Sequence, residues 1–148
     1  MQQHPYLRAY MAGIVIPTLF LLIGLTAFIV ARYVYDVPLA IERVIVFPMA
    51  VVPNLWGLWN ILYVAFLGRR RISLGLFGAL LPFLLVPGAW VVACLAGVAV
   101  PSFIPRALPF FFPVGVAIYY LAWKYLVGAL NAIVGLPSWS VGVPPASM

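Results

Sequence analysis

Hydrophobic residues run along this chain in four long stretches that are separated by short polar borders. The stretches cover about residues 9–31, 44–67, 72–100 and 107–134. A helix needs roughly 20 consecutive apolar residues to cross the hydrocarbon core of a bilayer, and each stretch meets that length. The pattern therefore predicts four transmembrane helices. The connections between them are short, so neighbouring helices should be antiparallel.

The same pattern predicts an all-α membrane protein with a single domain over residues 1–135. We expect a compact four-helix bundle with short loops, because glycines in every span allow helices to approach closely. These glycines are Gly13, Gly24, Gly57, Gly75, Gly78, Gly97, Gly115 and Gly128. The last residues, 136–148, lack periodicity and charge, and we predict that they form a mobile C-terminal tail.

Composition excludes several classes of protein. Hydrophobic residues make up 67% of the chain and charged residues 7%, whereas a soluble domain carries about a quarter charged residues. The chain is therefore neither a soluble globular domain, nor a disordered segment, nor a nucleic-acid-binding module. We attribute the net charge of +6 to membrane topology and to anionic lipid headgroups.

The basic residues divide unequally between the two predicted sides of the membrane. One side holds Arg8, Arg69, Arg70 and Arg71, with Lys124 if its side chain extends that way; the other holds Arg32, Arg43 and Arg106. Short cytoplasmic loops carry an excess of Lys and Arg. This predicts a multi-pass protein of a bacterial-type inner membrane with both termini in the cytoplasm. Arg69, Arg70 and Arg71 are predicted to contact anionic lipid.

Prolines interrupt every span, and the chain contains fourteen of them. An interior proline removes a helical hydrogen bond and kinks the helix, so we predict kinked spans. The spacing also suggests a parallel duplication of a two-helix hairpin. The matching pairs are Gly13–Pro17 with Gly78–Pro82, and Pro53–Gly68 with Pro113–Gly128. The alternative is that apolar helices built from few residue types align by chance.

Polar and aromatic side chains concentrate in the second and fourth spans. The set comprises Asn54, Trp56, Trp59, Asn60, Tyr63, Tyr119, Tyr120, Trp123 and Lys124. Helical spacing places four of them on one stripe of the second span: Trp56, Trp59, Asn60 and Tyr63. Two interpretations stay open: hydrogen bonding that joins helices, or a ligand or lipid pocket with aromatic walls.

Two members of this set carry separate predictions. Asn54 lies near the bilayer centre, so its amide should face inward and bond to another span, through Thr18, Tyr120 or a carbonyl freed by Pro113. Lys124 lies close enough to the end of its span for its stem to reach the headgroups. The alternative for Lys124 is a functional intramembrane charge.

Chemistry-bearing residues are scarce. With one Cys, one His, Asp36 and Glu42, the chain offers no zinc or haem ligand set, and we predict no metal, no cofactor and no catalytic residues. The leading hypothesis is a non-enzymatic accessory, assembly or scaffold subunit. Its partners would be membrane lipids and other membrane-protein subunits or further copies of itself, and not nucleic acid.

Two other functions remain open at this point. One is an oligomeric small transporter or channel for an apolar or zwitterionic solute, bound between spans two and four. The other is a membrane enzyme acting on lipid, for which Asp36 and Glu42 are the only acidic groups.

Overall fold

The computed structural model describes residues 4–36, 45, 47–67, 72–97, 100 and 102–136. Within these residues the regular elements are all helical. Four helical units there are long and apolar enough to cross a bilayer: Pro5–Tyr33, Met49–Phe66, Leu74–Leu95 and Phe103–Ile133. This confirms the prediction of an all-helical chain with four helices of membrane-spanning length. Glu42, Arg43, the arginines 69–71 and the predicted tail beyond Leu136 lie outside the described residues.

Helix α1 (Pro5–Tyr33) is one uninterrupted helix and is longer than the predicted 9–31. It begins at Pro5, where the missing N–H of proline costs nothing because the first-turn N–H groups have no helical acceptor. Pro17 lies inside the helix, and Arg32 lies in the last turn. A cation at that end interacts favourably with the helix dipole.

The second and fourth units both contain π-helical turns. The second unit consists of η1 (Phe47–Val51), α3 (Val52–Leu62) and η2 (Tyr63–Leu67). The fourth consists of α6 (Phe103–Leu121), η4 (Ala122–Val127) and α7 (Gly128–Ile133). A π-helical turn widens the hydrogen-bonded ring by one residue and so rotates the side chains that follow it.

The third unit is broken at Leu80 into α4 (Leu74–Ala79) and α5 (Leu81–Leu95). Pro82 has no N–H to donate to the preceding turn. Around Leu80 the backbone forms hydrogen bonds that span three residues instead of four. The interruption predicted at Pro82 is therefore present, whereas Pro87 lies inside α5 without ending it.

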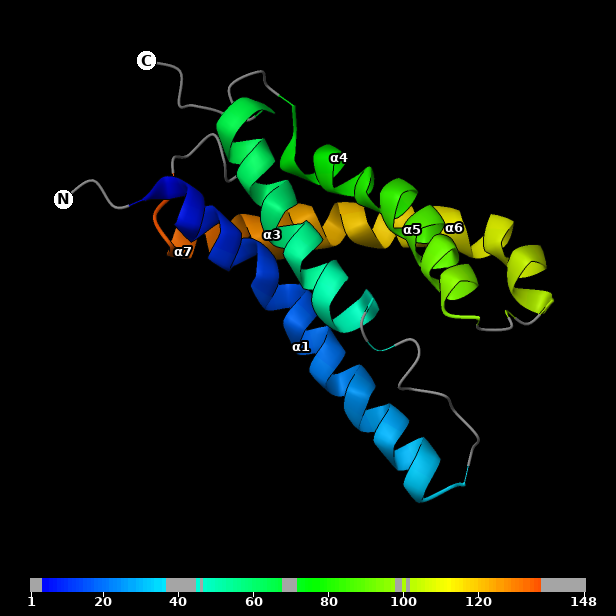
Figure 1. The fold of residues 1–148 in the computed structure, drawn as a ribbon. Coiled ribbons are helices and arrows are strands. Elements are labelled where there is room, and N and C mark those ends of the chain that lie inside the picture. Colours follow the sequence, from blue (N-terminus) through cyan, green and yellow to red (C-terminus); the bar gives the residue numbers. More distant parts are fainter. Residues whose placement is uncertain are drawn as a thin grey trace, which may run out of the picture.

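The four units form two antiparallel hairpins, α1 with α3, and α4–α5 with α6 (Figure 1). The hairpins pack together at the end where α1 begins and α7 ends, and they diverge towards the other end (Figure 1). The bundle predicted from the sequence is thus closed at one end only. The buried core lies there and contains Ala9, Trp56, Tyr63, Val64, Leu74, Phe77, Leu81, Leu85, Trp123, Val127 and Leu136.

Glycines mark where the helices meet. A Cβ atom on Gly13 would lie 2.7 Å from the Trp56 carbonyl oxygen, and one on Gly78 would lie 2.0 Å from Cγ of Trp123. These distances are shorter than any normal contact, so no larger residue fits without displacing the neighbouring helix. By contrast, Gly24 and Gly115, in the diverging part, have no described atom within 4 Å of that position.

Candidate functional site

A pair of buried asparagines joins three helices at the closed end. Asn60 of α3 and Asn131 of α7 are both 0% exposed. The Asn60 Nδ2 group donates to the Asn131 Oδ1 atom at 2.7 Å, and the Asn131 Nδ2 group donates back to Asn60 Oδ1 at 3.2 Å. Asn60 Nδ2 also donates to the Ala9 carbonyl of α1 at 2.7 Å. The two amides therefore satisfy each other while fixing α1, α3 and α7 together.

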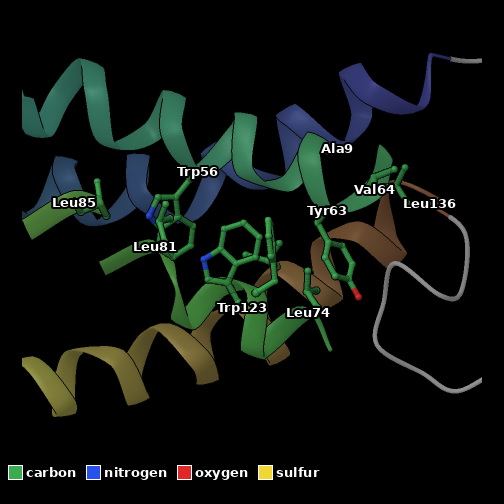
Figure 2. Packing of buried hydrophobic residues seen from close by; sticks show 11 residues of the cluster. Ala9, Trp56, Tyr63, Val64, Leu74, Leu81, Leu85, Trp123 and Leu136 are labelled. Carbon is green, nitrogen blue, oxygen red and sulfur yellow. The ribbon is translucent and has the colours of Figure 1, made fainter. Parts of the chain in front are cut away.

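Aromatic side chains, among them Trp56, Tyr63 and Trp123, occupy the buried core at the closed end (Figure 2). The Trp56 ring lies 5.3 Å from the Trp123 ring and 5.2 Å from the Tyr119 ring, measured between centroids. Trp59 stacks on Phe77 of α4 at 4.7 Å, and Tyr63 lies 5.6 Å from the same ring. The stripe predicted on the second span thus faces both α4 and the fourth unit.

The N–H and O–H groups of these aromatic side chains differ in whether they have a hydrogen-bond acceptor. The Trp59 indole N–H donates to the Phe77 carbonyl at 2.9 Å, and the Tyr63 hydroxyl donates to the Ile72 carbonyl at 2.8 Å. The indole N–H groups of Trp56 and Trp123 are buried and have no hydrogen-bond acceptor among the described residues. Buried indole N–H groups usually have an acceptor.

Asn54 lies at the edge of the helix pair, and its side chain is exposed. Its Oδ1 atom accepts a hydrogen bond from the Tyr10 hydroxyl of α1, and its Nδ2 group donates to the Ala50 carbonyl at 2.6 Å. The predicted bond to another span is present, but to Tyr10 and not to any of the partners we named. The inward orientation was wrong. The contact at Gly57 explains the exposure of Asn54. Tyr10 and Ile14 of α1 fill the space against that glycine, so the Asn54 side chain lies at the edge of the contact between α1 and α3.

Tyr120 and Lys124 lie on the face of the fourth unit that meets α4 at Gly75. The Tyr120 ring and the Lys124 Cβ atom both pack against this glycine, while the Lys124 side chain as a whole is exposed. The Lys124 ammonium lies 5.7 Å from the Tyr120 ring centroid and 5.2 Å from that of Tyr125. A cation over aromatic faces is stabilised by their quadrupoles. Of the predicted set, the structure therefore brings together Trp56, Trp59, Asn60, Tyr63, Tyr119 and Trp123, and leaves Asn54 and Lys124 at its margin.

Three residues of this cluster were missed from the sequence: Asn131, Tyr10 and Phe77. A signal was available for Asn131, since it is an amide within an apolar span and meets the criterion that singled out Asn54 and Asn60. Phe77 and Tyr10 carry no such signal. They are ordinary aromatic residues whose roles depend on which helix they face.

Two apolar clefts open on the surface of the described residues. One, of about 630 Å³, follows the second half of α1, and we call it the α1 cleft; it is lined by Leu22, Ile23, Thr26, Ala27, Val30, Ala31 and Tyr35. The other, of about 320 Å³, lies between α5 and α6, and we call it the α5–α6 cleft; it is lined by Phe83, Val86, Pro87, Leu108, Pro109 and Phe112. Both are open clefts lined almost wholly by apolar atoms.

The arrangement offers hydrogen bonding, aromatic packing and apolar surface. Among the described residues, no group of three or more His, Cys, Asp or Glu side chains lies close enough to hold a metal ion. The arginines predicted to contact lipid, Arg69, Arg70 and Arg71, lie outside the described residues. Comparison with protein-family models, with curated proteins and with solved structures finds no match to this chain.

Proposed function

We propose that this chain is a multi-pass membrane protein that acts as an accessory or scaffold subunit, holding a helix of a partner membrane protein in the α1 cleft. The observation that carries the proposal is the asymmetry of the two hairpins. One end is closed by the asparagine pair and the aromatic cluster, while the other end leaves long apolar helices apart (Figure 1).

The closed end supports a structural role for most of the polar and aromatic residues. Asn60, Tyr63 and Trp59 each make a hydrogen bond to a different helix or to a helix start. Side chains that bind one another in this way hold the helices together. This favours helix association over the transporter alternative.

The α1 cleft supports a protein partner for the open end. The buried residues of α1 all belong to its first half, Ala9, Ala12, Gly13 and Pro17. The second half presents Ala27 and Ala31 beside Thr26 in the cleft. Small residues four positions apart allow another helix to approach closely. The Thr26 hydroxyl donates to the Leu22 carbonyl of its own helix at 2.9 Å, and its oxygen can still accept a hydrogen bond from a partner helix.

The proposal is tested by co-purification from native membranes in mild detergent. We expect a tagged wild-type chain to retain a stoichiometric partner and Ala27→Leu to lose most of it, because the added side chain occupies the α1 cleft. Leu25→Phe is the control. It adds bulk on the same helix at a residue that does not line the α1 cleft, and residues two positions apart, such as Leu25 and Ala27, lie on different faces of a helix.

The outcomes separate the candidate functions. Equal loss of the partner in both variants, or a wild-type chain that purifies without any partner, contradicts the scaffold proposal. A chain that purifies alone as a defined oligomer and moves solute into liposomes would support the transporter alternative instead.

The proposal includes a membrane orientation with both termini in the cytoplasm. The described residues can be probed by cysteine labelling in a Cys94→Ala background, since Cys94 is exposed. We expect Val34→Cys, at a residue that is 66% exposed and outside the α1 cleft lining, to react with an impermeant reagent outside intact cells and Ile72→Cys to be protected. Ile72 is used because the next residue, Ser73, caps α4: its hydroxyl accepts from the Leu76 N–H at 3.2 Å. External labelling of Ile72→Cys refutes the orientation.

We also infer that the two hairpins arose by duplication. Aligning Pro53 with Pro113 places the π-helical turn η2 opposite η4, and Tyr63 opposite Trp123. Both of these aromatic residues are almost fully buried. The two hairpins thus have a π-helical turn at matching positions. This match in the backbone supports the duplication independently of the spacing of prolines and glycines.

A further inference from the structure

We propose that the indole N–H groups of Trp56 and Trp123 form the donor end of a binding site for a carbonyl oxygen, carried by an apolar molecule dissolved in the bilayer. A quinone ring with a hydrocarbon chain is the type of ligand that fits. The inference goes beyond the scaffold role and does not depend on it.

The two indoles are the observation that points to a ligand. Trp123 is 0% exposed and Trp56 is 5% exposed, and neither N–H has an acceptor among the described residues. Tyr119 is the polar neighbour of Trp56, and the centroids of the two rings lie 5.2 Å apart. In Figure 2 both indole nitrogens lie on the edges of the rings that face the part of the cluster where Leu81 and Leu85 lie.

The chemistry of the site selects a neutral acceptor. An indole N–H is a donor without charge and cannot accept a hydrogen bond. Lys124 follows Trp123 in the chain, but its ammonium lies over the rings of Tyr120 and Tyr125. Burying an anion against uncharged donors is costly, whereas a carbonyl oxygen needs only hydrogen bonds.

The depth of the site in the bilayer shows which kind of molecule can supply the carbonyl, a dissolved compound or a phospholipid ester. Trp56 lies in the helical unit Met49–Phe66, about 10 Å from its first residue and about 15 Å from its last at the helical rise. Phospholipid ester groups lie at the boundary of the hydrocarbon core, near the ends of such a helix. A carbonyl that reaches Trp56 must therefore belong to a molecule without a charged headgroup.

The α5–α6 cleft provides a place for the apolar part. Its volume of about 320 Å³ matches the lower range of small-molecule sites, about 300–1,000 Å³. Phe112 of this cleft and Tyr119 lie on the same face of α6, two turns apart. Leu85 belongs to the buried core with both tryptophans, and the next residue, Val86, lines the cleft.

Leu81 and Leu85 belong to the buried core with both tryptophans and lie next to them on the side of their indole nitrogens (Figure 2). The ligand carbonyl reaches the indoles when these two side chains change rotamer, which is the motion that the proposal requires. Leu85→Ala should therefore widen the path and increase the binding of the probe.

The test uses the full chain in nanodiscs of ether-linked phospholipids, which contain no ester carbonyl. The probe is a para-benzoquinone that bears a decyl chain, and decylbenzene serves as the carbonyl-free control. Isotope-labelled indole N–H resonances are followed by NMR. We expect the resonances of Trp56 and Trp123 to shift downfield with the quinone and not with decylbenzene, while that of Trp90, on the exposed surface of α5, stays in place.

Variants give a second measurement. Trp123→Phe keeps an aromatic ring but removes the donor, and should weaken quinone binding about five- to tenfold, the factor expected for one neutral hydrogen bond. Trp90→Phe is the matched control and should leave the affinity unchanged.

Three results would overturn the proposal. The first is no shift of the two indole resonances with the quinone. The second is an equal response to decylbenzene. The third is a shift of these resonances when ester-linked lipids replace ether-linked lipids with no response to the quinone, which would assign the acceptor to a lipid ester.

Discussion

Replacing Asn60 by leucine is the sharpest test of how the closed end is held together. Leucine is close to asparagine in size, so Asn60→Leu removes the amide without leaving a large cavity. The change deletes the hydrogen bond to the Ala9 carbonyl and both hydrogen bonds with Asn131. Because Asn131 is 0% exposed, water cannot easily replace what its amide loses.

The expected decrease in the free energy of unfolding can be estimated from these three hydrogen bonds. Hydrogen bonds between membrane helices contribute about 0.6 kcal/mol on average and up to about 1.7 kcal/mol. The 2.7 Å bonds belong to the stronger part of that range because they are short and buried. Leaving buried polar groups without partners costs about 1–3 kcal/mol. We therefore expect Asn60→Leu to lower the free energy of unfolding by about 2–4 kcal/mol.

A double-mutant cycle distinguishes pairing from simple packing. The variants are Asn60→Leu, Asn131→Leu and the combination, with reversible unfolding in mixed micelles followed by circular dichroism. Each single change leaves a buried amide facing a leucine, whereas the double change leaves two apolar side chains in contact. The double variant should thus lose less stability than the two single losses combined, by about 1 kcal/mol or more.

Asn54→Leu is the matched control for this experiment. It also removes an amide from α3, but Asn54 is exposed and bonds to Tyr10 and to its own helix. We expect a loss of about 1 kcal/mol or less. An Asn60→Leu loss no larger than that of Asn54→Leu, or strictly additive single losses, would refute the reasoning that the asparagine pair joins the helices.

Three further substitutions test other contacts by the same unfolding measurement. Trp59→Phe keeps the ring stacked on Phe77 but removes the indole donor to its carbonyl, so stability should fall by about 1 kcal/mol; an unchanged value contradicts the bond. Gly78→Ala places a methyl group 2.0 Å from the Trp123 side chain and should cost about 1–3 kcal/mol; a gain would mean that the helices are further apart. Lys124→Met removes an exposed cation from two aromatic rings and should change stability by about 1 kcal/mol or less, whereas a large loss would show that Lys124 has a buried partner.

The order and length of the helices could be predicted from the sequence. A run of about 20 consecutive, predominantly apolar residues predicts a helix that spans a bilayer, because a helix pairs its backbone polar groups within the segment. Pro82 predicts an interruption from its missing N–H, and the helix does break at Leu80, but Pro17 and Pro87 lack the same group and lie inside unbroken helices. The order and length of the helices thus depend on neighbouring residues in the chain, whereas the choice of the proline that breaks a helix does not.

The faces of the helices could not be predicted in the same way. In a soluble protein the polar stripe of a helix marks its outer face, but lipid is as apolar as leucine and gives no such contrast. Asn54 and Asn60 looked equivalent in the sequence, and the structure buries Asn60 against Asn131 while Asn54 stays exposed. The difference comes from Gly13 and Gly57, which let α1 and α3 meet at one level.

The sequence by itself thus determined that the chain forms four apolar helices of membrane-spanning length, because that outcome depends on local hydrophobicity and backbone hydrogen bonding. The tertiary structure alone decided that the hairpins close at one end, that Asn60 pairs with an unforeseen asparagine, and that the indole donors of Trp56 and Trp123 are buried without an acceptor among the described residues. These features depend on how residues far apart in the chain fit together. The glycines allow the close contacts, but the sequence around a glycine does not show which helix will pack against it.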